Sequence, residues 1–180
     1  MKNIVKSVLF LSLIMAGSVQ AAFINSYDVT KWTKTTNGGS INTAGAPNSV
    51  VLTSSNNGGG AKNQDFAIAA AGDGIVSFNW NYATTDINSS WDPFGWLLNG
   101  VFTKLTVNGS ALTQSGTVSF NVLAGNVFGF RANSVDSAFG AGVTTISNFS
   151  APNPVPVPAA IWLMGIPLMG LMGLKRKKAV

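Results

Sequence analysis

Residues 76–82 read VSFNWNY, and this stretch decides the fold. Its apolar side chains, Val76, Phe78, Trp80 and Tyr82, alternate with Ser and Asn, which gives a period of two residues. Successive side chains of a β-strand point to opposite faces, so this period predicts a strand with one buried face and one polar face. A sheet protein with a polar outer surface is therefore expected.

The same pattern continues along the middle of the chain. Alternation recurs over residues 101–107 and 118–122, and further strands are expected over 49–53, 65–69, 94–98, 126–132 and 143–149. Turn signals such as Asn-Gly at 99–100 and 108–109 separate these segments. The hexapeptide GIVSFN at 74–79 is echoed by GTVSFN at 116–121, which suggests two equivalent strands. About eight short strands and no helical period predict an all-β domain, a β-sandwich or jelly roll, over residues 22–151.

The positive charge of the chain lies at its two ends. The formal net charge is +5, although charged residues make up only 9% of the sequence, against roughly 25% in an average soluble protein. Between residues 22 and 150, five basic residues stand against six acidic ones, a net charge of −1. Electrostatic binding of nucleic acid needs a basic patch on the domain, and this distribution excludes it.

The chain contains no Cys and no His. Disulfides, thiolate metal sites and the Ser-His-Asp and Cys-His types of catalysis are therefore excluded. Asp86 and Asp92 are the close pair of acids that a glycosidase mechanism would need, but nothing in the neighbouring sequence indicates a raised pKa. We therefore expect a protein that is not an enzyme.

The N-terminus has the pattern of a signal peptide over residues 1–21. Lys2 and Lys6 supply positive charge, residues 8–16 form a short apolar run, and Val19-Gln20-Ala21 resembles an A-x-A cleavage site. Cleavage after Ala21 or after Ala22 fits equally well. This pattern predicts a leader helix that directs the chain to the Sec translocon and is then removed by signal peptidase.

The C-terminus has three parts. Residues 152–158 carry a proline at every second position, which predicts an extended linker, and the apolar residues 159–174 predict a single transmembrane helix of about 24 Å. Lys175, Arg176, Lys177 and Lys178 then predict a stop-transfer signal, with a cytoplasmic tail over residues 175–180. The expected topology is a transient single pass through the inner membrane, with the domain on the periplasmic side.

These C-terminal residues resemble a known family of sorting signals, the PEP-CTERM class, in its V-P-L-P-A-A-x-W-L variant. The matching residues are Val155, Pro156, Val157, Pro158, Ala159, Ala160 and Trp162. Val157 stands where Leu is usual, and the Glu of the commoner V-P-E-P form is missing. The resemblance implies recognition by an exosortase, a membrane cysteine transpeptidase of Gram-negative bacteria. It also implies delivery to the cell surface or to an exopolysaccharide matrix.

Residues 80–152 also resemble the domain often found ahead of this sorting signal, which supplies no settled activity. Within it, Trp91, Phe94 and Trp96 form a cluster that could stack on sugar rings. Aromatic residues also commonly fill cores and pack loops, so this reading competes with a purely structural one.

Oxygen-bearing side chains at alternate positions predict a candidate calcium loop just before these aromatics. The candidate ligands are Asp86, Asn88, Ser90 and Asp92. The loop lacks the central Gly and the bidentate acid of an EF-hand, and Asp and Asn also favour ordinary turns. The function expected from the whole sequence is a structural or adhesive surface or matrix protein. The alternative is a carbohydrate-binding module that engages exopolysaccharide.

Overall fold

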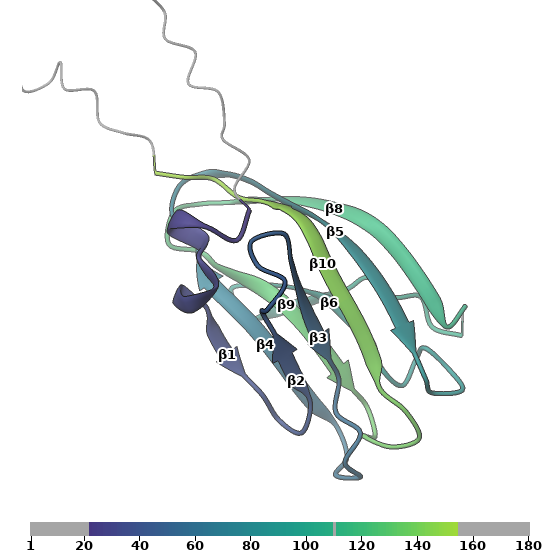
Figure 1. The fold of residues 1–180 in the computed structure, drawn as a ribbon. Helices are drawn as coiled ribbons and strands as arrows, with labels where there is room; N and C mark the ends of the chain where they lie inside the picture. Colours follow the sequence, from purple (N-terminus) through teal and green to yellow (C-terminus); the bar gives the residue numbers. More distant parts are fainter. Residues whose placement is uncertain (1–21, 110, 155–180) are drawn as a thin grey trace, which may run out of the picture.

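The computed structural model describes residues 22–109 and 111–154, which form two antiparallel β-sheets packed face to face (Figure 1). One sheet has the strand order β1-β4-β9-β6-β7 and the other β2-β3-β10-β5-β8. Two 3-10 helices, η1 (Asn25–Tyr27) and η2 (Val29–Lys31), precede the strands. The strands are β1 (Thr33–Thr35), β2 (Ser40–Asn42), β3 (Ser49–Thr53), β4 (Lys62–Ala69), β5 (Gly74–Thr84), β6 (Phe94–Leu98), β7 (Val101–Lys104), β8 (Thr113–Val122), β9 (Val127–Ser134) and β10 (Gly142–Ser150).

The predicted β-sandwich is confirmed, and strands β3 to β10 correspond to the eight expected segments. Strands β1 and β2 were not predicted. Each has three residues and lies at the edge of its sheet, and all of them except Ile41 are exposed. So short an exposed strand shows no alternation between buried and polar positions, which is the signal that the prediction needs.

Strand β5 organises one sheet because it lies between β8 and β10. Its alternating residues Val76, Phe78, Trp80 and Tyr82 are all buried, as expected from the sequence. The two segments that share the echoed hexapeptide are direct neighbours in the antiparallel ladder of β5 and β8, where Val76 lies opposite Phe120.

Aromatic rings from the two sheets fill the space between them. Phe78 of one sheet meets Phe130 of the other with ring centroids 4.8 Å apart, and Trp96 stacks on Phe120 at 3.9 Å. Such pairs stabilise by about 0.5–1.5 kcal/mol beyond the burial of their area. This core fixes the strand ends from which the loops emerge.

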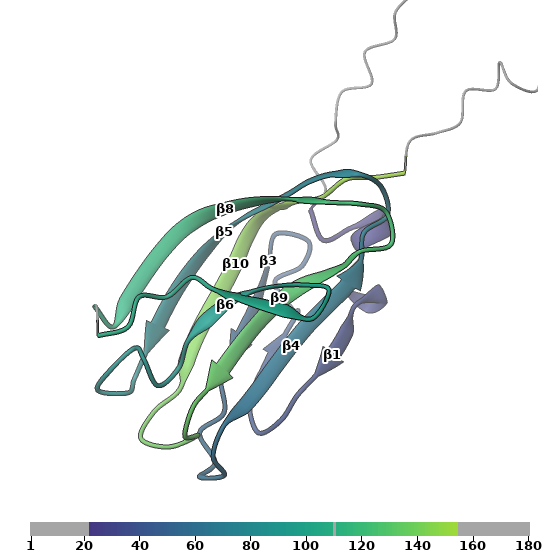
Figure 2. The same ribbon diagram turned by 180° about the vertical axis from the view of Figure 1, so that it is seen from behind.

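The two ends of the described chain lie at the same end of the sandwich, as both views show (Figures 1 and 2). The Tyr27 hydroxyl donates to the carbonyl of Pro152 at 2.5 Å and accepts from the backbone N–H of Ala71 at 3.0 Å. The opposite end carries the loops β3–β4 (54–61), β5–β6 (85–93) and β9–β10 (135–141). These three segments are called the distal loops below.

The predicted signal peptide (1–21), the sorting motif from residue 155, the transmembrane helix (159–174) and the basic tail (175–180) lie outside the described residues. Within residues 22–109 and 111–154, no helix has the length and apolar character needed to cross a membrane.

Candidate functional site

The distal loops are joined to one another by backbone hydrogen bonds. The N–H of Val135 donates to the carbonyl of Trp91 at 2.8 Å, which ties the β9–β10 loop to the β5–β6 loop. The N–H of Gly58 donates to the carbonyl of Ser137 at 2.5 Å, which ties the β3–β4 loop to the same assembly. The three loops therefore present one connected surface at the end farthest from the described chain ends.

Exposed aromatic side chains are concentrated on this surface. Among the described residues, the aromatic side chains classed as exposed are Trp91, at 40%, and Phe139, at 86%. Ile87 is 87% exposed and Val135 is 42% exposed on the same two loops. Other exposed apolar side chains, such as Ile75, Val101 and Leu123, lie outside the distal loops, so it is the two exposed aromatic rings that distinguish this surface.

Phe139 is also held in an unfavourable backbone conformation. Its φ is 63°, in the left-handed region that costs a residue with a side chain about 1–2 kcal/mol. The adjoining backbone is fixed, because Gly140 N–H donates to Asn56 Oδ1 at 3.3 Å and Ala141 N–H donates to Thr85 Oγ1 at 3.1 Å. A strained residue that presents an exposed phenyl ring is a candidate for function rather than for stability.

Of the three aromatic residues predicted to bind sugar, Trp91 alone lies on the distal loops. Phe94 is 1% exposed in the core beside Trp80, and Trp96 is half-buried and stacks on Phe120 from the opposite sheet. Both belong to β6, whose alternation turns them inward. The prediction of one surface cluster is therefore wrong for Phe94 and Trp96.

Asp92 belongs to the β5–β6 loop, is buried, and accepts hydrogen bonds at both carboxylate oxygens. Ser54 Oγ donates to Oδ1 at 2.7 Å and Thr84 Oγ1 donates to Oδ2 at 2.9 Å. Each hydroxyl also accepts a backbone N–H, from Gly142 at 2.8 Å and from Asp86 at 3.0 Å respectively. Since those N–H groups occupy the hydroxyl lone pairs, both hydroxyl protons are directed at Asp92, which is the arrangement suited to an ionised carboxylate.

Burial opposes that charge. Burial raises the pKa of the Asp92 carboxyl above its ordinary value, hydrogen bonds from Ser54, Thr84 and Ser134 lower it, and the neighbouring Asp86 raises it further. The sequence-based expectation that no acid here has a raised pKa is therefore wrong for Asp92. The cause is burial to 2% exposure, which a polar loop sequence does not show.

The predicted calcium loop does not form as a set of four converging ligands. Asn88 Oδ1 accepts from the backbone N–H and the hydroxyl of Ser90, at 2.9 and 2.6 Å, in a local turn. Asp86 and Asp92 point inward instead and are each 2% exposed. In the part of the chain that the structure describes, no three acidic, His or Cys side chains gather around a common point.

Three buried polar atoms at this end of the core have no hydrogen-bond partner: Asp86 Oδ2, the Tyr82 hydroxyl and Thr144 Oγ1. Tyr82 and Thr144 lie directly opposite each other in the ladder of β5 and β10. Burial raises the pKa of Tyr82 to about 12, and the nearby charges of Asp92 and Asp86 act in the same direction. Unpaired buried polar atoms are rare in native structures, so this group calls for an explanation.

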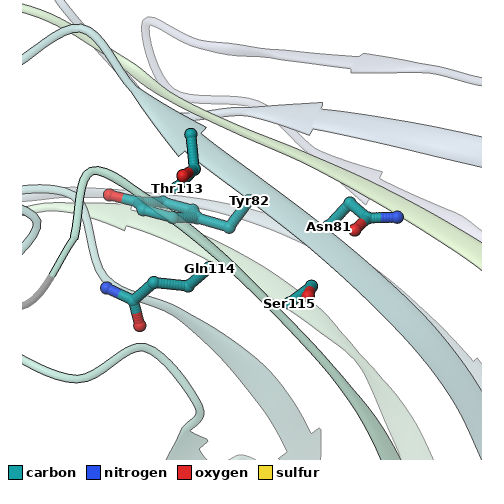
Figure 3. A pocket seen from close by; sticks show the side chains of 5 residues that line it. All are labelled: Asn81, Tyr82, Thr113, Gln114 and Ser115. Carbon is teal, nitrogen blue, oxygen red and sulfur yellow. The ribbon is translucent and has the colours of Figure 1, made fainter.

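Tyr82 also lines an open depression of about 380 Å³ at the same end of β5 and β8 (Figure 3). Its other lining residues are Asn81, from β5, and Thr113, Gln114 and Ser115, from β8.

Phe139, Ile87 and Tyr82 were not predicted from the sequence as candidate site residues. Phe139 had a readable signal, because it is a lone aromatic residue between two predicted strands. Tyr82 had none, since the alternation of β5 identifies it only as a core residue.

Neither a protein-family model nor a curated protein sequence matches this chain. Among solved structures, it is similar to a family 35 carbohydrate-binding module from Clostridium thermocellum, with 14% identity, a TM-score of 0.38, and coverage of 66% of this chain and 92% of that one. It is also similar to the CBM35 from Paenibacillus barcinonensis, with 18% identity, a TM-score of 0.37, and coverage of 69% and 95%. At these identities and TM-scores the likeness carries no information about a ligand.

Proposed function

We propose that this chain is an exported, non-catalytic surface protein whose β-sandwich binds carbohydrate at the distal loops. The observation that carries the proposal is the placement of the exposed aromatic side chains. Trp91 and Phe139 lie on two loops that are hydrogen-bonded to each other, and Phe139 is exposed in spite of an unfavourable φ.

The chemistry of the distal loops suits a sugar. The C–H face of a pyranose ring packs on an aromatic ring, while amides and hydroxyls hydrogen-bond its hydroxyl groups. Amide and hydroxyl side chains are abundant here, with Asn56, Asn88 and Ser90 on the same loops as the two aromatic residues. Because the charges of residues 22–150 nearly cancel, a neutral polysaccharide is the expected ligand class.

The position of the distal loops supports the same proposal. They lie opposite the end at which Pro154 leaves the sandwich, and the proposed membrane helix begins only five residues later, at 159. In an anchored protein, the distal loops would therefore face away from the membrane, where matrix polysaccharide is accessible.

The test is affinity electrophoresis of the purified protein in gels that contain neutral polysaccharides. Phe139→Ala and Trp91→Ala are each expected to weaken retardation by about tenfold in Kd, the loss typical of an anchor side chain. Leu123→Ala is the matched control, because Leu123 is 65% exposed at the opposite end. Equal retardation of all three variants and the wild type would reject the distal loops as the site.

A second proposal concerns delivery, and the layout of residues 155–180 supports it. We infer that an exosortase-type transpeptidase recognises the Pro motif after export and transfers the domain to the surface or the matrix, where a structural or adhesive role is the alternative to sugar binding. The intact mass of the mature protein tests this. Loss of everything after the Pro motif is expected, and a surface species that keeps Lys175 would mean a simple membrane anchor.

A further inference from the structure

Strand β8 is a long sheet edge with a neighbouring strand on one side only. It is the last strand of its sheet, next to β5, and both views place it at the outer margin of the sandwich (Figures 1 and 2). Among the described residues, no hydrogen bond outside the ladder with β5 reaches the backbone of residues 113–122. Alternate residues of an antiparallel strand direct both backbone groups to the same side, so a row of N–H and C=O groups is available at this edge.

The other sheet edges are protected in ways that β8 is not. β1, β2 and β7 have three, three and four residues, whereas β8 has ten. Residues 105–130, which include β8, contain no charged residue and no proline, and the ladder with β5 runs without a bulge. Short length, charge, proline and bulges are the usual means by which proteins keep a sheet edge from pairing with another chain. The edge of β8 has none of them.

The ladder of β5 and β8 shows which strand fits this edge. It aligns GIVSFN (74–79) with residues 117–122, antiparallel, with Ser77 opposite Ser119 at its centre. The matching hexapeptide of β8, GTVSFN (116–121), differs from that of β5 only by Thr117 in place of Ile75. Strand β8 therefore already pairs with a near copy of itself. A second β8 placed with Ser119 opposite Ser119 would repeat every residue pair of this stretch except the one that contains Ile75.

The repeated pairs include specific side-chain contacts. Phe120 lies opposite Val76 in the present ladder, and Val118 lies opposite Phe78. Val118 and Phe120 are only half-buried at this edge, although both pack against the core. A second β8 would set its own Phe120 opposite Val118 and cover the part of both side chains that remains exposed. Pairs of aromatic and β-branched residues are among those that stabilise neighbouring strands.

Charge favours the antiparallel arrangement of two copies. One end of β8 lies beside Asp73, whose Oδ1 accepts from the backbone N–H of Ala124 at 2.7 Å. At the other end, Gln114 Oε1 accepts from the backbone of the β7–β8 loop at 2.8 Å, and Lys104 Nζ donates to Asn108 Oδ1 of that loop at 2.6 Å. Since Ala124 of one copy would lie opposite Gln114 of the other, the Asp73 end of each copy would approach the Lys104 end of its partner.

We propose that this protein forms a homodimer through β8, with Ser119 opposite Ser119 of the second copy. The two five-stranded sheets that contain β8 would then form one continuous sheet, and the two-fold axis would pass between the central serines. Because the paired strands are antiparallel, the distal loops of the two copies would lie at opposite ends of the dimer. An anchored copy would therefore join a copy from a facing surface, which is an adhesive contact. This last consequence rests on the proposed delivery to the surface, whereas the strand pairing does not.

Cysteine cross-linking tests the register. The chain contains no cysteine, so a single introduced thiol can form a disulfide only with a second copy. Ser119→Cys is expected to give a disulfide-linked dimer on mild oxidation of the purified protein, because the Cα atoms of directly opposite residues lie about 4.5–5.5 Å apart. Thr113→Cys is the matched control. It is exposed on the same face of the same strand, but the two copies of residue 113 would lie about 40 Å apart.

Cross-linking of Ser119→Cys at least about tenfold faster than that of Thr113→Cys is expected. Equal rates in the two variants would overturn the proposal, because they would mean random collision or another interface. The comparison also holds if the apolar residues 159–174 bring copies together, since such association does not select residue 119 over residue 113.

Sedimentation velocity of the purified protein gives a second readout that needs no oxidation. The wild type is expected to dimerise reversibly, and Ser119→Lys is expected to weaken dimerisation by at least about tenfold, because it sets two like charges directly opposite each other. Thr113→Lys adds the same charge away from the axis and is expected to keep the wild-type affinity. A wild type that is monomeric at about 100 μM, or equal dimerisation of Ser119→Lys and the wild type, would overturn the proposal. No sugar is present in either experiment, so carbohydrate binding is tested separately.

Discussion

Replacing Asp92 by alanine removes the acceptor shared by two hydroxyls at the distal end, those of Ser54 and Thr84. Ser54 follows β3 and Thr84 ends β5. The backbone N–H groups that donate to these hydroxyls stay in place, so the hydroxyls cannot reorient without losing a second bond. The variant therefore leaves two buried donors without an acceptor.

The magnitude follows from two opposing effects. Two buried hydroxyl donors left unsatisfied, at about 1.5–2 kcal/mol each, destabilise the fold by roughly 3–4 kcal/mol. Removal of an uncompensated buried charge returns about 2 kcal/mol of this. The expected net loss of unfolding free energy is therefore about 1–2 kcal/mol. Asp92→Asn keeps one acceptor and the shape, so its loss is expected to stay below about 1 kcal/mol.

Urea denaturation followed by tryptophan fluorescence measures these differences as shifts of the midpoint at constant m. An Asp92→Ala variant within about 0.5 kcal/mol of the wild type would refute the hydrogen-bond reasoning. A variant order with Asn less stable than Ala would refute it as well.

Two further predictions test the backbone strain at Phe139 and the burial of the two tyrosine rings. Phe139→Gly should raise the unfolding free energy by about 0.5–1 kcal/mol. Glycine relieves the left-handed conformation, which costs about 1–2 kcal/mol, and this gain exceeds the extra chain entropy that glycine has when unfolded, about 0.5–1 kcal/mol. A lower denaturation midpoint than that of the wild type would contradict this. Burial raises the pKa of both tyrosines, Tyr27 and Tyr82, the latter to about 12. The phenolate absorbance of the folded protein should therefore show no step near pH 10. The free energy of unfolding that these neutral tyrosines contribute should be complete below pH 10 and should be lost as the pH rises toward 12. A phenolate step near pH 10 without unfolding would contradict the burial of these rings.

The architecture could be predicted because two patterns indicate it: the alternation of apolar and polar residues in β5, and the similar hexapeptide in β8. The edge strands β1 and β2 could not, since exposed three-residue strands bury no face and leave no period. The site was harder for a different reason. Asp86 and Asp92 occupy a polar loop sequence that looks exposed, and only the fold of three loops over them makes them buried.

The aromatic residues show the same limit of prediction from local sequence. Trp91, Phe94 and Trp96 are close in sequence, but the start of β6 at Phe94 separates a loop residue from two inward-facing ones. Phe139 lies 48 residues from Trp91 along the chain, and the hydrogen bond between Val135 and Trp91 brings their loops together. Juxtaposition across loops depends on strand order, which local pattern does not encode.

The most direct test of the central claim is the retardation of the purified protein by neutral polysaccharide, compared between the wild type and the double variant Trp91→Ala/Phe139→Ala. The proposed function predicts clear retardation of the wild type, its loss in the double variant, and full retention in Leu123→Ala. A double variant that folds and is retarded as strongly as the wild type would contradict carbohydrate binding at the distal loops.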